Sequence, residues 1–213
     1  MKTGLGAALA ISIRLLVAQT PSGVADAPTI PKITGVNPEI LNLVIQDQWD
    51  RGNDMFGGRA VKPPESVTGQ EVARRDDLRH AAVRKLLADG KLRSGKDYEY
   101  AALIFQHSGA ANDLILAHTL AVTAVAKGEG NAKWLAAAAF DRYLHAVKQP
   151  QVFGTQFLRG PDGAWSMEPY DRTALSDSVR ALWCIVPLAE QERILKDVRD
   201  GKPMGPTGIS GCN

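Results

Sequence analysis

The chain has 213 residues, of which 45% are hydrophobic, and 25 Lys and Arg oppose 23 Asp and Glu, for a formal net charge of +2. These values are ordinary for a globular protein, and they exclude a disordered, collagen-like or wholly membrane-embedded chain. The charge balance lacks the basic excess typical of nucleic-acid-binding proteins, so we expect no nucleic-acid partner. A chain of this length is expected to fold as one domain.

The N-terminus has the parts of a secretory signal. Lys2 precedes the uncharged stretch 4–13, and residues 25–27 (Ala-Asp-Ala) form a small-x-small processing pattern. The apolar run is interrupted by Arg14 and is shorter than the about 20 residues that span a membrane. We predict a secreted or periplasmic protein with no membrane span after cleavage near residue 19 or 27; a structured N-terminal helix is the alternative. The predicted divisions are a signal peptide (1–27), a linker (28–36), a helical domain (37–200) and a flexible Gly/Pro-rich tail (201–213).

Residues 37–200 carry helical periodicity over most of their length. Asn37 before Pro38 and Glu39 is typical of a helix start. Short connections around 109–111 and 128–130 predict antiparallel hairpins, loosely like those of tetratricopeptide repeats. The predicted fold class is therefore all-α, a bundle of six or seven helices with one long polar loop. The expected helices cover about 38–51, 66–89, 97–108, 112–127, 131–148, 176–186 and 189–199.

The long polar loop is the segment 149–172. Pro-Asp-Gly at 161–163 predicts a turn, and the residues around it predict a short hairpin. Irregular segments of this length in a compact domain are often functional. Gln151, Thr155 and Gln156 carry amide and hydroxyl groups beside a glycine, which permits close approach by a ligand. We therefore expect these three side chains to contact a ligand.

Two polar residues interrupt apolar stripes on the helices expected at 112–127 and 131–148. His118 and Asp141 lie at the same height if these helices form a hairpin. A buried carboxylate needs a partner, and a neutral imidazole can supply one donor. We predict a hydrogen bond between His118 and Asp141, made directly or through water. This His118–Asp141 pair could be catalytic, or it could only stabilise the fold without taking part in any reaction.

Three further polar residues belong to the candidate site. Gln106 and His107 end the helix expected at 97–108, where a histidine can also interact with helix carbonyls. Arg142 points about 100° away from Asp141 around its helix and can reach the long loop. The sequence lacks G-x-S-x-G, H-E-x-x-H, P-loop and G-x-G-x-x-G motifs. The sequence therefore predicts a binding domain for a polar ligand or a protein segment, with contacts from Gln106, Arg142, Gln151, Thr155 and Gln156.

A hydrolase is the alternative function, so whether the protein is an enzyme stays open. His107 or His118 would be the general base, Asp141 would orient it, and Arg142 with Gln156 would stabilise negative charge. We predict no cofactor. A metal site using His107, His118 and Asp141 is the remaining alternative to a metal-free protein.

Other charged and sulfur-bearing residues have simpler interpretations. The run 74–77 (Arg-Arg-Asp-Asp), His80 and His145 are expected to face solvent. Cys184 lies in an apolar run and is expected in the core, whereas Cys212 is the penultimate residue. A disulfide between the two cysteines would pin the tail, and export would permit it.

The polar pairs resemble the motifs of a bacterial family of uncharacterised proteins. The matching residues are Gln106-His107, Asp141-Arg142 and the stretch 149–156, which ends in Phe-Gly-Thr-Gln. A terminal Asp and Arg of that family would correspond to Asp177 and Arg180. The resemblance covers roughly residues 40–190 and implies a fold unit with a polar cluster, but no reaction.

Overall fold

The computed structural model describes residues 32–53, 55 and 67–209. The predicted signal peptide and the first residues of the predicted linker lie outside this part of the chain. The described residues are mostly helical, which confirms the predicted all-α bundle. The elements are α1 (Pro38–Asp50), α2 (Gly69–Ala88), α3 (Gly95–Phe105), α4 (Ala111–Ala126), α5 (Ala132–Ala146), β1 (Leu158–Arg159), β2 (Trp165–Ser166), α6 (Asp177–Leu182) and α7 (Leu188–Arg199).

Local side-chain caps begin several of these helices. The Asn37 side chain accepts hydrogen bonds at the start of α1, and Thr68 and Ser176 do the same for α2 and α6. Ser94 and Asp97 form a reciprocal capping box at the start of α3. These side chains satisfy backbone N–H groups that a first helical turn leaves unpaired. Helices α4 and α5 begin without a side-chain cap bond.

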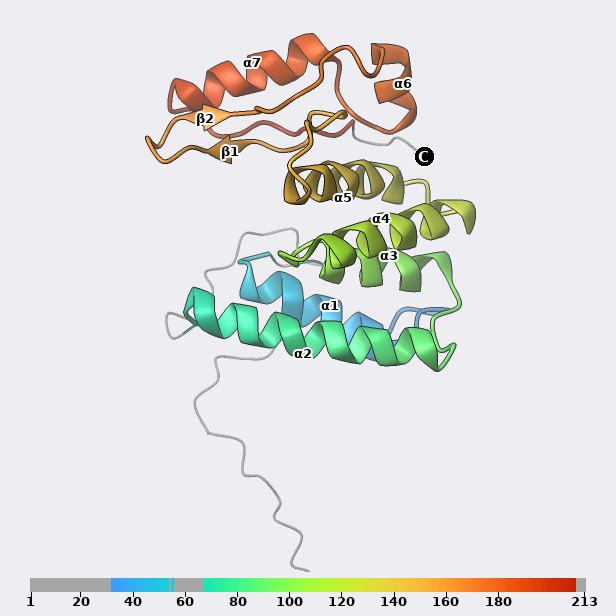
Figure 1. Ribbon diagram of the computed structural model, residues 1–213. Coiled ribbons are helices and arrows are strands. Elements are labelled where there is room, and N and C mark those ends of the chain that lie inside the picture. The colour runs from blue at the N-terminus through green and yellow to red at the C-terminus, as the bar shows by residue number, and fades with distance from the viewer. Residues whose placement is uncertain (1–31, 54, 56–66, 210–213) are drawn as a thin grey trace, which may run out of the picture.

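Long-range contacts show that α1 and α3 run in the same direction. At their starts, the Asn37 backbone N–H donates to Asp97 Oδ1 at 2.7 Å. At their other ends, His107 Nδ1 lies 3.2 Å from Asp47 Oδ1. The elements are stacked approximately in chain order, from α1 and α2 to α7 (Figure 1).

Helix α4 runs back against α3. A Cβ placed on Gly95, at the start of α3, would lie 3.2 Å from the Ala124 carbonyl oxygen, near the end of α4. A short loop then returns the chain through α5. The C-terminal ends of α1, α3 and α5 are therefore on the same side of the stack, and this side carries the candidate site.

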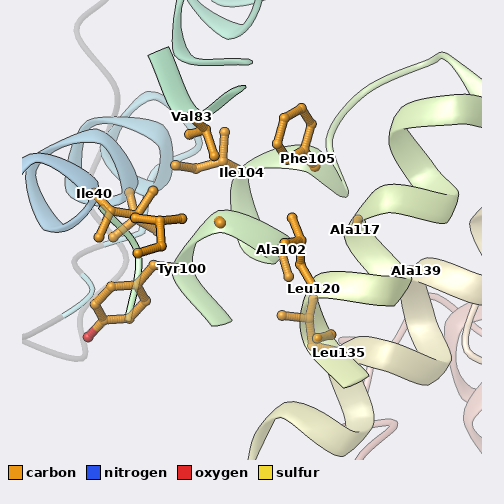
Figure 2. Packing of buried hydrophobic residues seen from close by; sticks show 14 of the residues in the cluster. Ile40, Val83, Tyr100, Ala102, Ile104, Phe105, Ala117, Leu120, Leu135 and Ala139 are labelled. Atoms are coloured by element: carbon orange, nitrogen blue, oxygen red, sulfur yellow. The ribbon is translucent and has the colours of Figure 1, made fainter. Parts of the chain in front are cut away.

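The main hydrophobic core is formed by residues of α1 to α5. Its large members interdigitate around α3, as Figure 2 shows for Ile40, Val83 and Phe105. The α4–α5 contact instead uses alanines with no exposed surface, including Ala117 and Ala136. Small side chains let two helix backbones approach closely. The C-terminal end of α5, which carries Asp141 and Arg142, therefore packs near α4.

The C-terminal part adds a hairpin and two helices. Strands β1 and β2 pair antiparallel and confirm the predicted short hairpin. The backbone N–H of Val186 donates to the carbonyl of Thr207, and that of Ile209 donates to Cys184, so this part of the tail is paired. Cys184 is buried, as predicted, and disulfide-bonded; Cys212 lies outside the described residues. Among the described helices, none has the length and apolar composition needed to cross a bilayer.

Candidate functional site

Asp141 holds the beginning of the polar loop. Its side chain has no exposed surface, and its carboxylate accepts hydrogen bonds from three backbone N–H groups, those of Val152 (2.9 Å), Phe153 (3.0 Å) and Thr155 (3.0 Å). The Thr155 hydroxyl donates a fourth bond at 2.8 Å. A carboxylate with four donors is well satisfied without a histidine. Asp141 therefore shapes the loop.

No direct hydrogen bond forms between His118 and Asp141, which the sequence predicted to be joined directly or through water. His118 Nδ1 lies 2.9 Å from the Ala136 carbonyl oxygen, and its ring packs 5.0 Å from the ring of Phe140. Asp141 turns instead toward the loop, where its carboxylate is the acceptor for the N–H groups of Val152, Phe153 and Thr155. The prediction of a direct bond was wrong because helix periodicity places a side chain on a face without choosing its partner.

The predicted ligand contacts in the loop are internal. The Gln151 amide, fully buried, donates from Nε2 to the carbonyls of Gln156 and Met167 and accepts the Gln156 N–H at Oε1, 2.9 Å away. Gln156 Nε2 donates to the Ala138 carbonyl at 3.3 Å and to Thr155 Oγ1 at 2.9 Å. The side-chain amides thus form hydrogen bonds with buried backbone N–H and C=O groups that would otherwise need partners from a β-sheet. Gln151, Thr155 and Gln156 thus stabilise the loop.

The same network reaches α7 through two residues that sequence analysis missed. Tyr170 donates its hydroxyl hydrogen to Gln191 Oε1 at 2.8 Å, and Gln191 Nε2 donates to the Phe153 carbonyl at 2.7 Å. Arg180 Nη2 donates to the Tyr170 hydroxyl at 3.1 Å. A single glutamine on an amphipathic helix gives no local signal of such a role. We call Asp141, Gln151, Thr155, Gln156, Tyr170 and Gln191 the loop network.

The last pair of the resemblance, Asp177 and Arg180, is also structural. Arg180 is almost completely buried, and its Nη1 lies 3.2 Å from Asp177 Oδ1. The same guanidinium donates to the carbonyls of Leu175 and Arg172. These bonds close the turn before α6 and leave no terminal amino group of Arg180 for a ligand.

A second polar group, the ionic cluster, joins α1 to α2. Its ion pairs are Arg79 with Asp50 (2.8 Å) and Asp76 (2.6 Å), and Arg51 with Asp47 (2.8 Å) and Asp76 (2.7 Å). The ionic cluster consists of Asp47, Asp50, Arg51, Asp76 and Arg79. It was not expected, because its α1 and α2 members are at least 25 residues apart in the chain.

The ionic cluster corrects part of the surface prediction. Asp76, expected to face solvent, is 8% exposed because α1 covers this side of α2. Burial by itself raises the pKa of Asp76, but hydrogen bonds from Arg51 and Arg79 outweigh burial and lower the pKa below 3.8. Burial lowers the pKa of Arg79, and its bonds to Asp76 and Asp50 reverse that effect and raise it.

Two other histidines differ from the expectation of solvent exposure. His80 is buried, its ring stacks on Phe105 at 5.0 Å, and its Nε2 lies 3.2 Å from the Ile104 carbonyl oxygen. His145 is half-buried, and its Nε2 is enclosed without a hydrogen-bond partner among the described residues. His80 is covered by α3, to which both Ile104 and Phe105 belong.

His107 meets the ionic cluster through Asp47. Its Nδ1 is 3.2 Å from each carboxylate oxygen of Asp47, which is fully buried. A carboxylate oxygen only accepts, so Nδ1 of His107 carries a hydrogen and donates it to Asp47. Within the described chain, Nε2 makes no hydrogen bond. The partner of His107 is thus Asp47 and not the predicted Asp141.

Arg142 is a partly buried positive charge that no described carboxylate compensates. Its side chain is partly buried, its Nε is enclosed without a hydrogen-bond partner, and it forms no ion pair in the described part of the protein. Burial lowers the pKa of Arg142, and the positive charge of Arg51 lowers it further. The carboxylates of the ionic cluster are already paired with other arginines, so none remains for Arg142.

Gln106 lies beside His107 at the end of α3. It is 6% exposed, and its Oε1 is buried with no hydrogen-bond partner among the residues that the structure describes. We call the surroundings of the Arg142 guanidinium the Arg142 site. Gln106, His107 and Arg142 were all candidates from the sequence: the first two end α3, and Arg142 lies near the end of α5, where the positive charge of Arg51 acts on it.

The alternative metal site is not formed. His107, His118 and Asp141 each have a different partner, as described above. No group of three His, Cys, Asp or Glu side chains able to hold an ion occurs in residues 32–53, 55 and 67–209.

Comparisons with known proteins were made by family model, by sequence and by structure. No family model matches the chain, and neither a curated protein nor a solved structure matches it.

Proposed function

We propose that this protein is a ligand-binding domain and that the Arg142 site takes a small anion. The observation that carries the proposal is the partly buried Arg142 guanidinium without a carboxylate partner in the described chain. The site lies near the polar loop, since Arg142 follows Asp141, the residue that anchors it. The loop amides themselves are internal and are no longer proposed as ligand contacts.

A guanidinium removed from water without a partner is unfavourable. The C-terminal ends of α1, α3 and α5 carry partial negative charge, which favours basic residues there. That partial charge does not satisfy the N–H donors of Arg142, whose Nη atoms make no hydrogen bond to described residues. An anion held by the two Nη groups would supply both the charge and the acceptors.

The test is calorimetric titration of the mature protein with sodium phosphate and sodium gluconate. Wild type is expected to bind at least one of these anions, and Arg142→Gln should weaken that binding about tenfold or more, or about 1.4 kcal/mol. Arg93→Gln is the matched control, because Arg93 is exposed and its side chain makes no described contact. Equal affinity in Arg142→Gln and wild type would contradict the proposal.

A hydrolase is not proposed as a second function. That alternative required Asp141 to orient the base, and Asp141 instead accepts four hydrogen bonds from the loop. His107 does have a carboxylate partner in Asp47, but no activated nucleophile accompanies it in the described residues.

Export remains part of the proposal. Its support is the sequence of residues 1–27 together with the disulfide-bonded state of Cys184, since disulfides persist in oxidising compartments. Fractionation of the expressing cells with N-terminal sequencing checks it. The expected mature end is near residue 19 or 27, and an intact Met1 in the cytoplasmic fraction would refute it.

A further inference from the structure

Two arginines lie against the same tryptophan on the β1–β2 hairpin. The guanidinium carbon of Arg159 lies 5.0 Å from the centre of the Trp165 ring, and Arg199 Nε donates to the Trp165 carbonyl oxygen at 2.8 Å. Arg159 lies directly opposite Trp165 in the hairpin, whereas Arg199 belongs to α7. Both arginines are exposed. Trp165 thus gathers two positive charges on the surface, at the end of the stack opposite α2 (Figure 1).

Neither charge is compensated within the described residues. The guanidinium of Arg159 makes no hydrogen bond or ion pair there, and the two Nη groups of Arg199 make none either. By contrast, Arg193, which is also on α7, forms an ion pair with Glu190. Asp162, the acidic residue of the hairpin turn, pairs with neither Arg159 nor Arg199. The N–H donors of two neighbouring guanidiniums are therefore available to a partner from outside.

Their contacts with Trp165 restrict the two arginine side chains before any partner binds. A guanidinium is attracted to the face of an aromatic ring, and the hydrogen bond to the carbonyl oxygen holds Nε of the second arginine. Less side-chain freedom is then lost on binding. Trp and Arg are also among the residue types that contribute most to the affinity of protein–protein interfaces. The arrangement is therefore suited to recognition of another molecule.

The number of charges favours a short acidic protein segment over a larger anion. Recognition of an anionic bilayer typically uses a cluster of about four to eight Lys or Arg, and recognition of a nucleic acid uses a broad basic surface. Two guanidiniums match instead a pair of carboxylates, each of which can accept two parallel N–H bonds. We infer that the hairpin surface formed by Arg159, Trp165 and Arg199 docks an acidic segment of a partner protein. This inference does not depend on the Arg142 site.

Fluorescence anisotropy of the mature protein with labelled hexaglutamate and hexaglutamine peptides tests the inference. Hexaglutamate should bind, and hexaglutamine should not. Arg159→Gln and Arg199→Gln should each weaken hexaglutamate binding by about threefold or more, because each removes one charge-assisted pair with a carboxylate. Arg93→Gln is the matched control, since it removes one exposed charge of the same kind elsewhere and should leave the affinity unchanged.

The controls identify the outcomes that contradict this docking role. An equal loss of affinity in Arg93→Gln would show general charge attraction and overturn the inference, as would equal binding of the two peptides. Tighter binding of phosphatidylglycerol vesicles or of a single-stranded oligonucleotide through Arg159 and Arg199 would overturn the choice of partner.

Arg142→Gln separates this inference from the proposed function. It should leave hexaglutamate affinity unchanged. If it is the variant that abolishes hexaglutamate binding, the peptide occupies the Arg142 site, and the docking inference is overturned while the anion site stands. Arg159→Gln decides the question even if Arg199→Gln disturbs α7, because the Arg159 guanidinium makes no hydrogen bond within the described chain.

Discussion

Asp141 and Arg142 are adjacent in the chain but have opposite environments. Asp141 is fully buried and accepts four hydrogen bonds, whereas Arg142 has no described ion-pair partner. The difference follows from their directions, because successive residues of a helix point about 100° apart. The Asp141 side chain binds the loop, whereas the Arg142 side chain is influenced by the charge of Arg51 at the end of α1. At the scale of single residues, the structural role of Asp141 and the proposed ligand contact of Arg142 are therefore separable by mutation.

Asp141→Ala should destabilise the protein by about 3–5 kcal/mol, because it leaves three backbone N–H groups and one hydroxyl without their acceptor in a buried place. Urea denaturation checks the value. Thr155→Val is the matched comparison, since it removes the hydroxyl bond to Asp141 and the bond from Gln156 Nε2 but keeps the three backbone bonds to Asp141, and it should cost about 1–2 kcal/mol. Similar losses in the two variants would show that Asp141 does not hold the backbone of the loop.

At the scale of elements, the ionic cluster determines how α1 lies on α2. Arg79 is the central cation, with Asp50 and Asp76 both within 2.8 Å. Arg79→Met should destabilise the protein by about 2–4 kcal/mol, because it removes one of the two arginine partners from each of the buried carboxylates Asp50 and Asp76, which keep only Arg75 and Arg51. Arg74→Met is the control: the Arg74 side chain is 62% exposed, so its loss should change the unfolding free energy by about 0.5 kcal/mol or less. Thermal or urea denaturation of the two variants measures both.

The ionic cluster should also make stability sensitive to acid. The pKa of Asp76 is lowered in the folded protein relative to 3.8, so the folded state holds its proton more weakly than the unfolded state does. Its contribution is present above about pH 4 and is lost as the pH falls through the folded pKa. Asp76→Asn should flatten the fall of the unfolding free energy below pH 4. Asp77→Asn, at an exposed neighbouring position, should leave the pH dependence of the unfolding free energy below pH 4 as in the wild type. The same pH dependence in both variants would contradict the role given to Asp76.

At the scale of the whole molecule, the loop network joins the bundle to the C-terminal part. Gly154 lies where the loop comes closest to α7. Its φ is +77°, and a Cβ added there would lie 2.5 Å from Gln191 Oε1 and 2.6 Å from the Tyr170 hydroxyl. The loop therefore approaches α7 so closely that no side chain fits between them. This contact makes the packing of α7 depend on the conformation of a loop that α5 anchors.

Gly154→Ala should destabilise the protein by about 2 kcal/mol or more, from backbone strain together with the displaced hydrogen bonds. Gly163→Ala is a closely matched control, because its φ is +78° but nothing lies within 4 Å of the added Cβ; strain alone should cost about 1 kcal/mol. Hydrogen exchange should show faster exchange in α7 than in α3 for the first variant only. Equal exchange in the two variants would show that α7 packs independently of the loop.

The sequence by itself determined the helices and the polar residues of interest. Asn37 caps the first helix, as its position before Pro38 and Glu39 predicts, and Gln106, His107, Asp141 and Arg142 were singled out before any contact was known. Such signals are local: a cap acts within one turn, and periodicity assigns a face. Only the tertiary structure decided the partners. It paired His107 with Asp47, 60 residues away, and Asp141 with the loop, because the partner of a polar side chain depends on which helix ends the stacking brings together. The same stacking leaves Arg142, which carries the proposed function, without a carboxylate partner among residues 32–53, 55 and 67–209.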